Sequence, residues 1–187
     1  MDRSLRSSPI QVARESWPAM RILSKENACE VLSGKSLDAF ITQLSSQLPL
    51  VEGTYSAPVK SGVQIALSKL FAYLVLRDSP VCLYVTGWGV ATEHLDLFDG
   101  YRRSVGEKRP LIEAPVHLFE RTDEDVFISV LCMVFFFSWD ASVFDLAGRS
   151  LLQTSHDGWL EVRTSDEALA KDVAVELASY RVPLLSR

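Results

Sequence analysis

The spacing of apolar residues along the chain predicts five amphipathic helices. Leu37, Ile41 and Leu44 recur at helical spacing behind Ser36, which is a suitable N-cap residue. Residues 122–125 have the spacing of a capping box and precede the most apolar segment, which we expect to be the most deeply buried helix. Similar patterns predict the remaining helices at residues 67–77, 92–106 and 165–180.

Strand formers concentrate in a second set of segments. Residues 81–86 are apolar nearly throughout, which predicts a strand buried on both faces. The turn signal Asp157-Gly158 predicts a hairpin between the last two of three further strands, at residues 139–146, 150–155 and 159–163. Weaker patterns suggest an edge strand at residues 116–119, a short strand at 28–32 and a loop at 50–62.

This order of elements predicts an α+β fold, with a mainly antiparallel sheet of about 4–5 strands packed against several helices. Strict alternation of strands and helices, which a doubly wound fold requires, is absent. The chain of 187 residues has no linker, repeat or low-complexity tract. We therefore expect one globular domain over residues 1–187, with about the first eight residues disordered.

Composition and charge narrow the choice of partners. The formal net charge is −5 and no basic cluster stands clear of acids, so we expect no binding to nucleic acid. The longest apolar run, residues 126–137, is too short to span a membrane, so no membrane association is expected. The three cysteines are an odd number and form no CxxC pair, which favours a reducing, cytoplasmic location.

Familiar cofactor and catalytic motifs are missing. The sequence contains no GxGxxG, GxSxG or HExxH, and the segment Ser33-Gly34-Lys35-Ser36 lacks the earlier glycine of a phosphate-binding loop. We interpret that segment as a turn followed by an N-cap. No cofactor and no bound metal are therefore predicted.

One histidine stands out as a candidate for acid–base catalysis. His156 is followed by Asp157, and Asp140 begins a neighbouring predicted strand, so the strand ends could place both carboxylates beside the imidazole. A metal site built from His117, His156 and Asp157 is a further possibility, since His and carboxylate ligands suit zinc or iron. The simpler interpretation is that His156 and Asp157 are ordinary hairpin residues.

Tryptophans beside acids form the other candidate site. Trp88 follows the buried strand, while Trp139 and Trp159 flank the predicted hairpins. Tryptophan anchors and acidic residues are typical of protein interfaces. The acids Asp96 and Asp99 lie on a predicted helix and could contact a basic partner. The competing interpretation is that the tryptophans are core residues, with the indole N–H of Trp139 satisfied by a nearby carboxylate.

These residues support three hypotheses. The first is a small acidic interaction module, similar in physical character to an immunity protein or a regulatory adaptor, that binds a basic protein through Trp88, Asp96, Asp99, Trp139 and Trp159. The alternative is a hydrolase or metal-dependent enzyme that uses His156 with Asp157 or Asp140. A third is a small-molecule sensor with a pocket near Trp88. The sequence does not identify the partner, the substrate, the oligomeric state or the role of residues 1–35.

Overall fold

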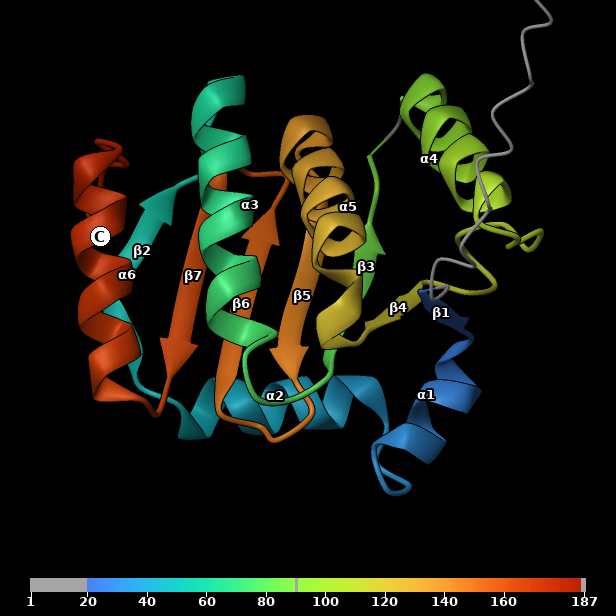
Figure 1. The fold of residues 1–187 in the computed structure, drawn as a ribbon, viewed down its shortest axis with the longest axis horizontal. Coiled ribbons are helices and arrows are strands. Elements are labelled where there is room, and N and C mark those ends of the chain that lie inside the picture. The colour runs from blue at the N-terminus through green and yellow to red at the C-terminus, as the bar shows by residue number, and fades with distance from the viewer. Residues whose placement is uncertain (1–19, 90, 186–187) are drawn as a thin grey trace, which may run out of the picture.

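The computed structural model describes residues 20–89 and 91–185, which form a seven-stranded sheet with helices on both faces. The strand order is β1-β4-β3-β5-β6-β7-β2, and every neighbouring pair is antiparallel (Figure 1). The first eight residues, for which disorder was predicted, lie outside the described residues. The strands are β1 Arg21–Leu23, β2 Leu50–Ser56, β3 Val81–Gly87, β4 Val116–Phe119, β5 Asp140–Asp145, β6 Ser150–Ser155 and β7 Trp159–Thr164.

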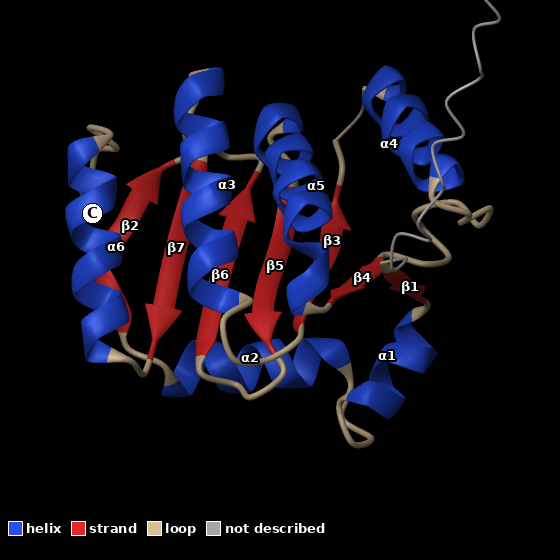
Figure 2. Ribbon diagram, in the orientation of Figure 1, coloured by secondary structure: helices blue, strands red, loops and turns tan. Residues whose placement is uncertain are grey.

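Three long helices run side by side over one face of the sheet, and a fourth packs near β3 and β4 (Figure 2). The main core lies beneath them, where side chains of alternate strand positions such as Leu83 and Val143 meet Phe71 and Leu131 of the helices. We call this side of the sheet the helix face. Its helices are α3 Ser61–Val75, α4 Thr92–Ser104, α5 Glu124–Phe137 and α6 Glu167–Ser179.

The opposite face is covered only in part. The helices α1 Lys25–Val31 and α2 Leu37–Gln47 pack there against Phe144 and Leu151, at one end of the strands (Figure 1). The ring of Phe40 lies 5.3 Å from that of Phe144, which fixes α2 near the end of β5. Nearer the other end of the strands this face carries mostly polar side chains.

The α+β class and the antiparallel sheet are confirmed, but the sheet has seven strands where about 4–5 were predicted. Residues 50–62 were expected to be a loop, yet Leu50–Ser56 form the edge strand β2. The edge assignment for residues 116–119 was wrong, because β1 pairs with β4 on the side away from β3. These errors share one cause, since strand pairing over long sequence distances leaves little local signal.

Two local predictions also need correction. Residues 28–32 were predicted to form a short strand but lie largely in α1, whose first turn is capped by the Ser24 hydroxyl. The capping box before α5 is formed by Glu120 and Asp123 around a short 3₁₀ turn at Arg121–Asp123, not by residues 122–125. Ser36 caps α2 as expected.

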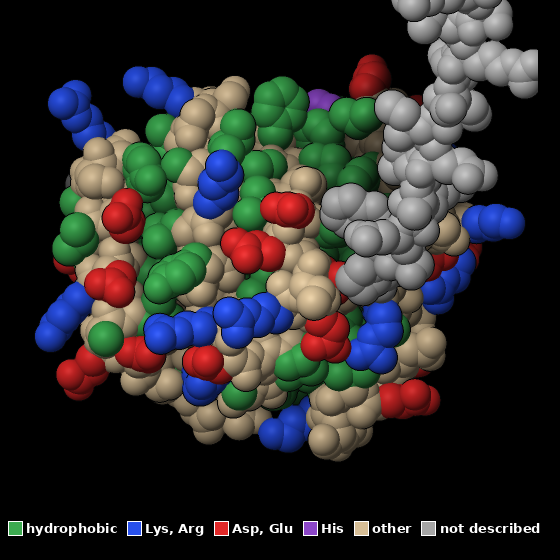
Figure 3. Space-filling model, in the orientation of Figure 1, with side chains coloured by type: hydrophobic (Ala, Val, Ile, Leu, Met, Phe, Trp, Pro, Cys, Tyr) green, Lys and Arg blue, Asp and Glu red, His purple; other side chains and the backbone are tan. Residues whose placement is uncertain are grey.

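On the helix face, acidic and basic side chains are interspersed with exposed apolar ones (Figure 3). The apolar side chains exposed on α3, α5 and α6 include Ile65, Tyr73, Phe136 and Val175. Within the described part of the chain, no helix has the length and apolar character needed to cross a membrane.

Candidate functional site

Beside α2, whose Ser45 hydroxyl donates to the Gln153 side chain at 3.2 Å, the sheet forms a shallow polar groove of about 250 Å³. Cross-strand pairing builds it, because Ser142, Gln153 and Glu161 stand opposite one another on β5, β6 and β7. A second row pairs Ser155 with Trp159. We call this surface the open sheet face and define it by Thr86, Asp140, Ser142, Gln153, Ser155, Trp159 and Glu161.

At the end of this groove, the first residue of β5 meets the hairpin between β6 and β7. The Asp140 carboxylate accepts a hydrogen bond from the backbone N–H of His156 at 2.8 Å. The His156 ring Nδ1 lies 2.9 and 2.8 Å from the two Asp140 carboxylate oxygens. Because a carboxylate only accepts, Nδ1 carries the proton in this contact. The Nε2 atom of the same ring is 3.5 Å from a carboxylate oxygen of Asp157.

A glycine at the end of β3 makes room for this carboxylate. Gly87 pairs with Asp140 across a register shift, and a Cβ atom built on Gly87 would lie 2.5 Å from Asp140 Oδ2. A side chain there would displace either the strand or the carboxylate. Gly158, with φ of 81°, provides the left-handed residue that the β6–β7 turn requires. Both glycines therefore help to place the Asp140–His156 pair.

The electrostatics of the pair favour a protonated imidazole. The hydrogen bond to Asp140 raises the pKa of His156, and the negative charges of Asp140 and Asp157 raise it further. The His156 side chain is 60% exposed, whereas that of Asp140 is 29% exposed. Asp140 therefore holds the ring orientation through Nδ1, while Nε2 faces the exposed carboxylate of Asp157; a carboxylate that orients an imidazole is the arrangement of an acid–base dyad.

Sequence reasoning grouped Asp140, His156 and Asp157, and the structure places these residues together, with Trp159 in the same groove as Asp140. The other candidate binding residues lie elsewhere. Trp139 is buried in the main core, and its indole N–H has no hydrogen-bond partner among the described residues, so the expected carboxylate partner is not present. Trp88 packs against the same core and does not line the open sheet face.

The two acids of α4 have different surroundings. Asp96 is exposed, but α4 packs through Phe98 on the helix face, so Asp96 does not share a surface with Trp159. Asp99 accepts a hydrogen bond at 3.0 Å from Arg102, whose side chain is fully buried. Asp99 therefore neutralises a buried guanidinium, and neither acid of α4 lines the open sheet face with Trp159.

The metal constellation of His117, His156 and Asp157 is not assembled. His117 is completely buried on the helix face of β4, next to the ring of Phe98, whereas His156 is exposed in a hairpin. Over residues 20–89 and 91–185, no group of three or more His, Cys, Asp or Glu side chains is placed to hold a metal ion.

Sequence reasoning missed the polar rows of the open sheet face. Thr54, Ser142, Gln153 and Glu161 lie on the same face of the sheet, where Ser142 is buried and the other three are half-buried. The hydroxyl of Thr54 on β2 donates to the Glu161 carboxylate on β7 at 2.6 Å, so this row of polar side chains extends to the edge strand. In β7, Glu161 and Arg163 alternate with the apolar residues Leu160 and Val162, and this is the signal that would have found part of the surface.

Fold and site together define an antiparallel α+β protein with an open polar sheet face and an Asp–His dyad at its end. Comparison of the chain with known protein families, with curated proteins and with solved structures finds no match.

Proposed function

We propose that this chain is a protein-interaction module that binds a basic segment of a partner protein across the open sheet face. The observation that carries the proposal is the partial cover of that face by α2, which leaves Trp159 half-buried beside Asp140 in a polar groove. An aromatic side chain next to a carboxylate suits an arginine or lysine, whose cation can stack on the indole and pair with the acid.

The charge of the groove supports a basic partner. Asp140 lines the groove with Trp159, and Asp157 and Glu161 add two carboxylates to the hairpin and strand that carry it, while His156 and Arg163 contribute the cations. When His156 loses its proton, Asp140 is left without its cationic neighbour and attracts a partner's cation more strongly. Because Asp140 and Asp157 raise the pKa of His156, affinity should increase as the pH rises through that raised value.

The proposal is tested by placing a photo-crosslinking residue at Gln153 and identifying the protein that it captures from source cells. The captured protein is then titrated with the wild type and with Trp159→Thr, which keeps a strand-forming residue while it removes the indole. We expect the dissociation constant to increase about tenfold or more for Trp159→Thr, as for a central interface residue. Trp159→Phe should recover part of the affinity.

Asp96→Lys provides the matched control, since it reverses an exposed acid on the other side of the sheet. An unchanged affinity is expected for this variant, apart from a small salt-dependent effect on the association rate. Loss of binding with Asp96→Lys but not with Trp159→Thr would move the interface to α4 and refute the proposal. Equal affinity of all variants, or capture of no protein, would also refute it.

The Asp140–His156 dyad supports a second candidate function, a hydrolase in which Nε2 of His156 acts as the general base. The groove beside it contains the hydroxyls of Ser142, Ser155 and Thr86. A screen with chromogenic ester and phosphoester substrates tests this function. Activity that rises with deprotonation of His156 and disappears in His156→Gln would favour the enzyme over the interaction module.

A further inference from the structure

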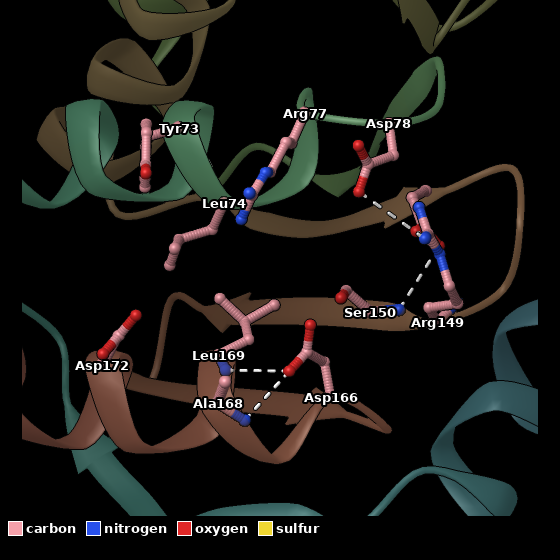
Figure 4. A pocket seen from close by; sticks show the side chains of 11 residues that line it. Tyr73, Leu74, Arg77, Asp78, Arg149, Ser150, Asp166, Ala168, Leu169 and Asp172 are labelled. Atoms are coloured by element: carbon pink, nitrogen blue, oxygen red, sulfur yellow. Dashed lines mark hydrogen bonds and ion pairs between the residues drawn. The ribbon is translucent and has the colours of Figure 1, made fainter.

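A second cavity, of about 110 Å³, lies on the helix face at the junction of three elements. Its walls are the last turn of α3 with the residues that follow it, the turn between β5 and β6, and the first turns of α6 (Figure 4). Leu74 and Leu169, together with Tyr73 and Ala168, supply its apolar surface. We call it the Arg77 pocket and define it by Leu74, Arg77, Arg149, Asp166, Leu169 and Asp172.

Some charges at the pocket are already compensated within the protein. The buried carboxylate of Asp145 accepts hydrogen bonds from the backbone N–H and the Nε of Arg149, at 2.7 and 3.1 Å. Arg149 also lies 3.7 Å from a carboxylate oxygen of Asp78. The guanidinium of Arg149 is therefore held between two acids and forms a fixed wall of the pocket.

The remaining charges face the cavity from opposite sides. Arg77 projects from the α3 side, and within the described residues it forms no ion pair with a carboxylate (Figure 4). Asp166 and Asp172 project from the α6 side. One oxygen of Asp166 accepts the N–H groups of Ala168 and Leu169, at 2.9 and 3.0 Å, which leaves its second oxygen directed toward the cavity (Figure 4).

This arrangement excludes a simple anion site. Asp166 already occupies the N-terminus of α6, where an anion would otherwise bind. A cation alone would meet Arg77 on the opposite wall. A ligand that carries both charges satisfies both walls, because its carboxylate can pair with Arg77 while its ammonium group pairs with Asp166 and Asp172.

We propose that the Arg77 pocket binds a small zwitterion of the α-amino acid class with a short apolar side chain. The carboxylate lies against Arg77, the ammonium group against Asp166 and Asp172, and the side chain against Leu74 and Leu169. The volume of the pocket indicates the size of ligand that fits. For comparison, an engineered cavity of about 150 Å³ holds benzene. At about 110 Å³ the pocket matches alanine or valine in size better than an aromatic amino acid. The proposal does not depend on the interaction function assigned to the open sheet face.

The test uses ¹⁵N-labelled protein titrated with L-alanine and L-valine. Saturable shifts of the backbone amides of Ala168 and Leu169 are expected, because those N–H groups contact Asp166. Propionate carries only the carboxylate and isopropylamine only the ammonium group. Each should bind at least tenfold more weakly than the amino acids. L-phenylalanine should bind more weakly than L-valine, because its ring exceeds the volume of the pocket.

Three variants locate the binding site. Arg77→Ala and Asp172→Asn should each weaken binding about tenfold. Asp166→Asn should also weaken binding while it retains the cap of α6, since asparagine is an equally good N-cap residue. Arg103→Ala, which removes an exposed arginine from α4, is the matched control and should leave the affinity unchanged. Shifts that increase linearly without saturation, equal binding of propionate or isopropylamine, or equal affinity of Arg77→Ala and wild type would overturn the proposal.

Discussion

His117 shows how a single buried side chain links stability to pH. Its ring is completely buried, and neither nitrogen has a hydrogen-bond partner among the described residues. Burial lowers the pKa of His117 to about 3, and the nearby charge of Arg102 contributes to this effect. The folded protein therefore keeps the imidazole neutral at a pH where the unfolded chain protonates it.

The sign of the pH effect follows from this difference. Between the unfolded pKa near 6.5 and the folded pKa of about 3, the unfolded state binds one more proton, so the free energy of unfolding decreases as the pH falls. One group contributes at most about 1.4 kcal/mol per pH unit. We predict that His117→Phe removes this contribution, measured by urea denaturation at a series of pH values.

A neighbouring aromatic residue provides the control for His117→Phe. Phe119→Leu alters packing on the same strand but introduces no titrating group, so it should lower stability by a similar amount at every pH. A pH dependence of His117→Phe equal to that of the wild type would show that another group is responsible.

Gly87 controls the Asp140–His156 pair through its lack of a side chain. We predict that Gly87→Ala pushes the Asp140 carboxylate away from His156, because the new methyl group would lie 2.5 Å from Asp140 Oδ2. The pKa of His156 should then fall toward its ordinary value, as measured by NMR titration of the ring. Gly62→Ala is the control, since open space surrounds Gly62 in α3 and the His156 titration should not change. An unshifted titration in Gly87→Ala would contradict the steric role.

At the scale of elements, the last described residues of the chain cover the free edge of β2. The backbone N–H of Ser56 donates to the Pro183 carbonyl, and that of Leu185 donates to the Thr54 carbonyl, both at 2.8 Å. Val182 is buried in the main core beside this contact. Residues 182–185 therefore cover polar backbone that would otherwise be free to pair with another chain.

We predict that ending the chain at Tyr180 lowers stability and promotes aggregation, because it uncovers the β2 edge and removes Val182 from the core. Denaturation curves and light scattering measure the two effects. The double variant Leu184→Ala and Leu185→Ala keeps the backbone hydrogen bonds and should remain monodisperse. Aggregation of both proteins to the same extent would assign the effect to the lost side chains instead.

The elements that the sequence predicted are those with strong local signals. The helices α2 and α5 and the buried strand β3 have clear periodicity or continuous apolar runs, and the β6–β7 turn has its Asp157-Gly158 signal. In contrast, β1 is only three residues long, and β2 contains Gly53 and a register shift, so neither has a regular alternation. Their pairing depends on distant strands, which local sequence does not encode.

The site was predictable only where its residues are close in the sequence or at strand ends. Asp140 and His156 are 16 positions apart; Asp140 begins β5 and His156 directly follows the adjacent strand β6, so their approach followed from the predicted meander. The role of Gly87 did not, because it depends on the pairing of β3 with β5. The extent of the open sheet face also depends on where α2 ends on the sheet, which is a tertiary property.

At the scale of the whole molecule, the three sites lie in different places. The open sheet face occupies one side of the sheet, the Arg77 pocket lies at the junction of α3 and α6, and His117 is buried beneath α4. None of the residues that define one site lines another. The effects of single substitutions at separate sites should therefore add in multiple variants.

The strand order also determines how late in synthesis the sheet can finish folding. Thr54 of β2 bonds to Glu161 of β7, 107 positions later in the chain. At ribosomal rates of about 5–20 residues per second, roughly 5–20 s pass between the emergence of the two partners. During that interval β2 has no strand to join, and the nascent chain carries an unpaired edge that chaperones are suited to protect.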